Sequence, residues 1–172
     1  MVNSEFSIRA ATEADARAIA EIHVAGWRAA YQGKVPDALL DSVSVEDRAA
    51  MWRQAMARPV HSLLVAEREG RVIGFVSLGP TTDEGAAKDT GEVYAIYVQP
   101  DIVGRGVGRV LLARGVEGLK SLGFGRGTLW VLENNARTLR FYEIAGWRPD
   151  GTEKVEDWNG FPLREVRYRT EL

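Results

Sequence analysis

The stretch that decides the fold is Val103-Gly104-Arg105-Gly106-Val107-Gly108-Arg109, which follows a β-prone run and opens a helical one. Eight of the 18 glycines lie between residues 104 and 127. Glycine lets the backbone approach a ligand closely, and free N–H groups at a helix start bind anions. Between residues 105 and 126 there are five basic side chains and one acidic side chain. The stretch therefore predicts a site for a diphosphate group.

Two other phosphate-binding loops fit this stretch poorly. A P-loop needs Gly-Lys-Ser/Thr after its second glycine, and that tripeptide is missing here. A dinucleotide-binding fingerprint needs Gly-x-Gly-x-x-Gly near the first strand of a parallel unit, whereas these glycines are spaced Gly-x-Gly-x-Gly. Taken alone, the stretch fits a glycine-rich turn before a solvated basic helix equally well.

The pattern on either side of the loop predicts one α+β domain spanning residues 1–172. Alternating residues and turn signals predict strands at 6–9, 62–67, 72–78, 92–98, 128–132, 147–154 and 163–171. Helical spacing and capping residues predict helices at 12–31, 44–58, 106–122 and 135–145. The predicted order is β-α-α-β-β-β-α-β-α-β-β.

Composition excludes several classes of protein. The 172 residues carry 22 basic and 24 acidic side chains, whereas a dedicated nucleic-acid binder is usually basic. The absence of cysteine excludes disulfides, thiolate metal sites and a cysteine nucleophile. No run approaches the ~20 apolar residues of a membrane span, and residues 1–9 lack a signal-peptide run. We expect a cytoplasmic protein that binds no metal, nucleic acid or membrane.

A second motif follows the glycine loop and reads Asn135-Ala-Arg-Thr138-Leu-Arg-Phe141-Tyr142-Glu143, then Ala145-Gly146-Trp147. With Ala95-Ile96-Tyr97-Val98-Gln99-Pro100 and the loop itself, it resembles the GNAT superfamily of acyl-CoA-dependent N-acyltransferases. The patterns of that family are Gln/Arg-x-x-Gly-x-Gly/Ala and Asn-x-x-Ala-x-x-Phe-Tyr-Glu-x-x-Gly-Phe. The chain departs from them at Val103, Thr138 and Trp147, and the change at Val103 would leave more of the phosphate contact to Arg105 or Arg109.

The resemblance implies a GNAT fold, with a mixed, mostly antiparallel sheet of about seven strands flanked by about four helices. It implies acetyl-CoA as cosubstrate, with backbone groups of Ile96, Tyr97 and Val98 pairing with pantetheine. The Val98 N–H would polarise the thioester carbonyl, and Asn135 would bond the pantetheine arm. The pyrophosphate would be held by the glycine loop, namely Val103, Gly104, Arg105, Gly106, Val107, Gly108 and Arg109.

Acyl transfer to an amine needs a proton donor for the leaving thiolate, a role that the resemblance gives to Tyr142. Tyr142 shares a helix face with Thr138 and Asn135. Core packing is the alternative role for its ring. An amine of pKa about 10.4 costs about 4–5 kcal/mol to deprotonate at pH 7, so a base or a path for its proton is also expected.

Glu92 is the candidate base, acting through water, and a salt bridge at the sheet edge explains it equally well. Strand parity places Glu92 on one face with Tyr94, Ile96 and Val98 unless a bulge intervenes. Glu133 and His23 are weaker candidates, and a structural role suits His23 and His61 better.

Trp27 and Tyr31 lie one helical turn apart and could form a wall of the acceptor pocket, although aromatic residues at this spacing more often pack in a core. Trp158 could cover that pocket or join a homodimer interface. We expect a small-molecule or peptide primary amine as acceptor. Transfer would be direct, because no cysteine can carry the acyl group. Alternatives are a longer acyl-CoA, a non-catalytic CoA-binding sensor domain and a nucleotide-binding module.

Overall fold

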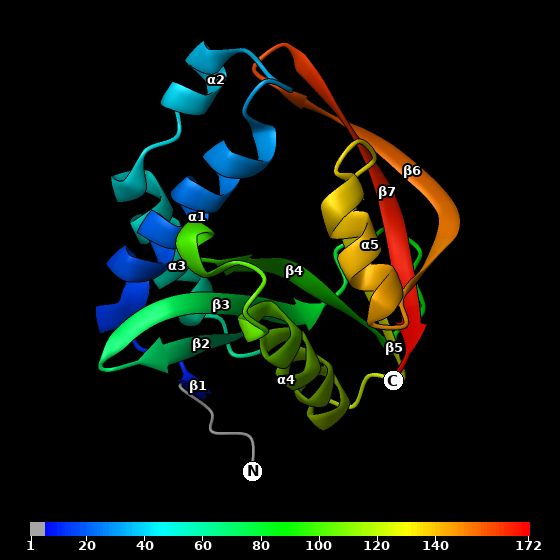
Figure 1. The fold of residues 1–172 in the computed structure, drawn as a ribbon. Coiled ribbons are helices and arrows are strands. Elements are labelled where there is room, and N and C mark those ends of the chain that lie inside the picture. The colour runs from blue at the N-terminus through cyan, green and yellow to red at the C-terminus, as the bar shows by residue number, and fades with distance from the viewer. Residues whose placement is uncertain (1–5) are drawn as a thin grey trace.

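A seven-stranded sheet in the order β1-β2-β3-β4-β5-β7-β6 forms the centre of the computed structural model, which describes residues 6–172 (Figure 1). Every neighbouring pair of strands is antiparallel except β4 and β5. The strands are β1 (Ser7–Ala10), β2 (Ser62–Arg68), β3 (Arg71–Pro80), β4 (Thr90–Val98), β5 (Arg126–Leu132), β6 (Arg148–Trp158) and β7 (Phe161–Glu171). The mixed, mostly antiparallel α+β sheet predicted from the sequence is confirmed.

Five α-helices lie within residues 6–172, and the short α2 falls in the segment 33–41, where the sequence predicts a loop that contains a helical turn. They are α1 (Ala16–Tyr31), α2 (Asp37–Asp41), α3 (Val45–Met56), α4 (Val107–Ser121) and α5 (Ala136–Ile144). Local capping explains several boundaries. Ser44 Oγ accepts the Asp47 N–H at the start of α3, and Asn135 Oδ1 accepts the Thr138 N–H at the start of α5.

The first predicted strand and helix differ slightly from the observed elements. Strand β1 begins at Ser7, and residues 1–5, which the signal-peptide prediction also concerned, lie outside the described residues. The predicted helix at 12–31 begins as a 3₁₀ turn, Glu13–Asp15, before α1. The Asp15 carboxylate turns back to accept the Thr12 N–H at 2.8 Å, which fixes this tight first turn.

Helices α4 and α5 cover one face of the sheet, and α1 and α3 cover the other (Figure 1). On the α4 face Leu111 and Leu119 pack with side chains of β3 and β5. On the α1 face Ile19 and Trp52 pack against Phe75 of β3. A third, smaller cluster forms where the β6–β7 hairpin reaches the end of α1 and α2; it comprises Tyr31, Val35, Leu40, Leu132 and Leu163.

Strands β4 and β5 separate after three residue pairs. They pair from Thr90–Arg126 to Glu92–Thr128, although β4 continues to Val98 and β5 to Leu132. Beyond this point β4 stays paired with β3, and β5 stays paired with β7. The sheet therefore has an opening between residues 93–98 and residues 129–132, and the backbone edges that face it have no strand partner.

A β-bulge at Tyr94 corrects the parity predicted for β4. Ser77 of β3 pairs with Ala95 and Leu78 pairs with Val93, so Tyr94 is the extra residue. Val93, Ile96 and Val98 pack on the α4 face, whereas Ala95 and Tyr97 pack on the α1 face. Glu92, which precedes Val93, therefore lies on the α1 face, opposite to Ile96 and Val98. The shared face predicted for these residues was wrong because the bulge reverses the alternation.

Candidate functional site

The glycine loop ends in a set of backbone donors with no acceptor. Gly104 and Gly106 have φ angles of 91° and 89°, a left-handed conformation that glycine adopts without strain. The Val110 N–H is the first to bond within α4, to the Gly106 carbonyl at 3.2 Å. The N–H groups of residues 106–109 donate to no acceptor among residues 6–172. This is the arrangement that binds anions at a helix N-terminus.

Basic side chains surround these donors. Arg105 and Arg109 are exposed, and neither makes an ion pair with an acidic side chain in the described part of the chain. Val103 is also exposed, with 41% of its surface accessible, so it supports the loop by no buried contact. The predicted anion site is therefore formed by backbone N–H groups and two free guanidinium groups.

The first turn of α4 meets the end of β4 and helix α5 at one point. A Cβ on Gly108 would lie 3.7 Å from both the Phe141 ring and the Val98 side chain. Gly108 therefore lies beside the last residue of β4 that borders the opening. A molecule bound at the loop could reach into the opening along Val98.

Tyr142 occupies the α5 side of this opening. Its side chain is 5% exposed and its ring packs near Phe141, Trp147 and Tyr168, at centroid distances of 5.2, 6.4 and 6.4 Å. Its hydroxyl bonds no residue in 6–172, yet it is not sealed from solvent. Burial raises the pKa of Tyr142 and the nearby Tyr97 adds to this effect, so the hydroxyl keeps its proton at neutral pH. It is a proton donor with no competing acceptor in the described chain.

Glu92 lies on the opposite face of the sheet, where β4 and β5 separate. Its Oε2 accepts bonds from the Thr82 N–H at 2.9 Å, from Thr81 Oγ1 at 3.1 Å and from Thr82 Oγ1 at 3.3 Å. Its Oε1 bonds no described residue and keeps a small solvent-accessible surface, since Glu92 as a whole is 6% exposed. Burial raises the pKa of Glu92, and the bonds to Thr82 and Thr81 oppose that rise. One carboxylate oxygen is thus held while the other can accept a proton.

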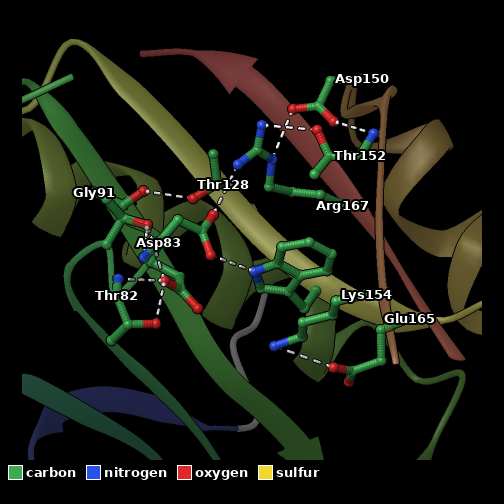
Figure 2. Close-up of polar contacts among 12 residues, drawn as sticks. Thr82, Asp83, Gly91, Thr128, Asp150, Thr152, Lys154, Glu165 and Arg167 are labelled. Atoms are coloured by element: carbon green, nitrogen blue, oxygen red, sulfur yellow. Dashed lines mark hydrogen bonds and ion pairs between the residues drawn. The ribbon is translucent and has the colours of Figure 1, made fainter. Parts of the chain in front are cut away.

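A partly buried network fixes the segment that carries these threonines (Figure 2). Asp83 accepts the Trp130 Nε1–H at 3.0 Å and an Arg167 N–H at 2.9 Å. Arg167 also donates to Asp150 at 2.8 Å and to Thr152 at 3.0 Å. This network ties residues 81–83 to β5, β6 and β7. Sequence reasoning missed it, because no local signal links Asp83 to a partner 84 positions away.

A second charged group lies on the same face. Lys154 Nζ is 3.2 Å from a carboxylate oxygen of Glu165 and 4.5 Å from the centroid of the Trp130 ring. Neither Trp130 nor Glu165 was predicted as a site residue. The signal available was strand alternation: Trp130 lies between Leu129 and Val131, which face the opposite cluster.

The aromatic pair of α1 packs as a cluster at the hairpin tip. The Trp27 and Tyr31 rings stack with centroids 4.2 Å apart, and Trp158 meets Trp27 edge-on at 4.0 Å. Trp158 thus packs within its own chain. A pocket of about 180 Å³ adjoins this cluster and is lined by Tyr31, Lys34, Leu132, Glu133, Phe161 and Arg164 among others. Tyr31 therefore lines a pocket, whereas Trp27 packs behind it.

The two histidines have packing partners. His23 Nδ1 lies 3.3 Å from Trp52 Nε1 as acceptor, and burial lowers the pKa of His23 to about 4. His61 Nε2 lies 2.6 Å from Ser77 Oγ, and burial lowers its pKa. Glu133, the other weaker candidate for the base, is exposed at the edge of the pocket. Across residues 6–172 no cluster of three acidic or histidine side chains is placed to hold a metal ion, and no helix is long and apolar enough to cross a membrane.

Comparison with known proteins agrees with this geometry. Residues 16–147 match the model of the acetyltransferase (GNAT) family. The chain is 36% identical to the uncharacterized N-acetyltransferase YuaI of Bacillus subtilis, over 95% of this chain and 88% of that protein. It is 31% identical to the L-amino acid N-acyltransferase MnaT of Escherichia coli, over 82% of this chain and 78% of that protein.

Among solved structures, yncA of Salmonella typhimurium with its cofactor acetyl-CoA superposes with a TM-score of 0.74 at 24% identity, over 97% of this chain and 94% of that one. That likeness shows the fold. The family model matches most of this chain. The alignment with each of the two relatives covers more than three-quarters of both proteins. This chain belongs to the acetyltransferase (GNAT) family and is an acyl-CoA-dependent N-acyltransferase.

Proposed function

We propose that this enzyme transfers an acetyl group from acetyl-CoA to a primary amine by direct attack in a ternary complex, and that residues 1–172 form a single catalytic domain. The observation that carries the proposal is the opening between β4 and β5. Unpaired donors of the glycine loop border it, and Tyr142 and Glu92 lie on its two faces. Acetyl-CoA supplies the activated acetyl thioester, and the structural relative yncA was solved with that molecule.

The glycine loop and the β4 edge fit the two ends of a CoA molecule. The free N–H groups of residues 106–109, with Arg105 and Arg109, suit a pyrophosphate. The edge of β4 has unpaired backbone groups from residue 93 to residue 98, which suit an extended amide chain such as pantetheine. We assign Ile96, Tyr97 and Val98 to that contact, and Asn135 to the same chain, because its Nδ2 bonds no described residue.

Three groups of this chain would take part in the chemical step. The Val98 N–H would donate to the thioester carbonyl oxygen and stabilise the negative charge that develops there. Glu92 Oε1 would take the proton of the acceptor ammonium, directly or through water. Tyr142 would give its proton to the departing thiolate, because its hydroxyl opens to the site and has no other acceptor within residues 6–172.

The acceptor would approach from the α1 face. The bulge at Tyr94 places Glu92 on that face, together with Tyr97, so the proposed base and the proposed acid lie on opposite faces of the opening. Tyr31 would line the acceptor side through the pocket that it borders. Trp27 would support Tyr31 by stacking. The MnaT relative is named as an amino-acid acyltransferase, which agrees with an amine acceptor.

Release of CoA thiol from acetyl-CoA tests this function. The chain has no cysteine, so a thiol reagent reports only CoA. We expect thiol release that requires the enzyme, acetyl-CoA and one member of a panel of polyamines, aminoglycosides, amino acids and N-terminal peptides. Binding of CoA without thiol release would indicate a sensor domain, and faster release from a longer acyl-CoA would reassign the donor. A covalent acyl-enzyme in mass spectrometry would refute direct transfer.

A further inference from the structure

Lys154 holds its ammonium where an amine substrate would be held. Its Nζ lies 3.2 Å from a Glu165 carboxylate oxygen and 4.5 Å from the centroid of the Trp130 ring. A carboxylate and the face of an indole ring both attract a primary ammonium. Figure 2 shows Lys154 pointing toward Glu165 beside the network of Asp83 and Arg167. The Lys154 contacts therefore mark a position on this surface where a carboxylate and an indole ring hold a primary ammonium.

Trp130 and Glu165, which we call the ammonium seat, lie beside the opening. Trp130 follows Thr128 by two residues, and Thr128 is where β5 leaves β4. Glu165 pairs with Leu132, the last residue of β5. Both side chains lie on the α1 face, because Leu129 and Val131, which flank Trp130, and Val166, which follows Glu165, pack in the cluster on the α4 face. The seat therefore lies on the same face as Glu92, at the side from which the acceptor would enter.

Acidic side chains lie near the seat, and Arg167, whose guanidinium carbon is 5.7 Å from the centroid of the Trp130 ring, is paired with Asp83 and Asp150. Burial raises the pKa of Glu165, the ion pair with Lys154 opposes that rise, and the negative charges of Glu156 and Glu92 add to it. The negative charge of Glu165 also helps to raise the pKa of Tyr31 and of Tyr97. The Lys154 side chain is 36% exposed, and ion pairs of such partly solvated side chains are weak. An incoming amine can therefore displace it.

We propose that Trp130 and Glu165 form the binding site for the ammonium group of the acceptor, and that Lys154 occupies this site as an internal competitor until the acceptor displaces it. The inference rests on the proposed function, since only an amine acceptor would compete with Lys154 in this way. The ligand class is a primary alkyl- or arylalkylammonium. Lys154 does not bind a carboxylate group of the acceptor in this arrangement.

Steady-state kinetics on Lys154→Met tests the competition directly. Methionine keeps the aliphatic chain over Trp130 and removes the charge. With n-butylamine and phenethylamine as acceptors, we expect KM to fall about threefold, equivalent to about 0.7 kcal/mol, at an unchanged kcat. Glu165→Gln should raise KM about tenfold. Lys120→Met is the matched control, because Lys120 is exposed in the last turn of α4, on the other face of the sheet, and should leave KM unchanged.

Calorimetric titration of phenethylamine into the enzyme–CoA complex gives a readout that does not depend on turnover. Tighter binding to Lys154→Met is expected, and this variant decides the question alone if Glu165→Gln fails to fold. An unchanged or higher KM in Lys154→Met would overturn the inference. A KM of Lys154→Met that rises for phenylalanine but not for phenethylamine would also overturn it. Lys154 would then bind the carboxylate of the acceptor. If the wild-type enzyme acetylates no amine, the proposed function fails and the inference fails with it.

Discussion

Removing one oxygen atom from Tyr142 separates its proposed role as proton donor from its role in packing. The Tyr142→Phe substitution keeps the ring, which packs near Phe141, Trp147 and Tyr168 with centroids 5.2 to 6.4 Å away. The lost hydroxyl bonds no residue in the described part of the chain, so no internal hydrogen bond is broken. We therefore expect the free energy of unfolding to change by less than about 1 kcal/mol.

The expected loss of activity is much larger. General-acid catalysis contributes about 10²–10⁴ in rate, which corresponds to about 2.7–5.5 kcal/mol of activation free energy. The CoA dissociation constant should not change, because none of the proposed contacts with the pantetheine chain and the pyrophosphate involves the Tyr142 hydroxyl. Single-turnover thiol release, with product release removed from the measurement, gives the rate of the chemical step.

Tyr168→Phe is the matched control for this prediction. Tyr168 belongs to the same cluster, and its hydroxyl donates to Glu143 Oε1 at 3.1 Å. Removing that hydroxyl should cost about 1 kcal/mol of stability and leave the single-turnover rate unchanged. A Tyr142→Phe enzyme that turns over at the wild-type rate, or that loses no more activity than Tyr168→Phe, would remove Tyr142 from the proposed acid role.

Three further predictions concern the base, the glycine loop and the N-terminal ion pair. Burial raises the pKa of Glu92, and a base acts in its deprotonated form, so kcat/KM should rise with pH around a pKa above that of an ordinary carboxyl group. Glu92→Gln should lose this acidic limb of the pH–rate profile. A variant that keeps the acidic limb would exclude Glu92 as the base. Gly106→Ala should cost about 1–2 kcal/mol of stability, because its φ is 89°, and should weaken CoA binding about tenfold in calorimetry. Gly85→Ala is the control, because Gly85 also has a positive φ, of 73°, and no atom lies within 4 Å of the added Cβ, so the loss of stability should be similar. If Gly85→Ala weakened CoA binding as much as Gly106→Ala, the contact of the glycine loop with CoA would not be specific. Hydrogen bonds from Arg9 lower the pKa of Asp15 to about 2, so the stability that this pair adds is complete above pH ~4 and is lost as pH falls toward 2. Asp15→Asn should cost about 1–2 kcal/mol at pH 7 in urea denaturation and flatten the acid dependence; an unchanged acid dependence would contradict the pairing.

The local elements that carry the proposed site were predicted from the sequence, and the arrangements that depend on strand pairing were not. The glycine loop before α4 and the helix predicted from residue 135 each involve consecutive residues, so their residue types indicate the structure. The face of the sheet on which Glu92 lies depends on the bulge at Tyr94, which the sequence pattern does not reveal. The ammonium seat and the Asp83–Arg167 pair bring together residues from strands far apart along the chain. Periodicity indicates which face a residue takes, and only strand register determines its partners.

Hydrogen–deuterium exchange with and without CoA tests most directly whether the opening between β4 and β5 is the cosubstrate site. The unpaired backbone groups of residues 93–98 and the free N–H groups of residues 106–109 should exchange quickly without ligand. Saturating CoA should slow exchange at both segments together, and leave the hairpin turn at residues 69–70 unchanged. Protection of the glycine loop without protection of β4, or protection of neither segment, would contradict the account.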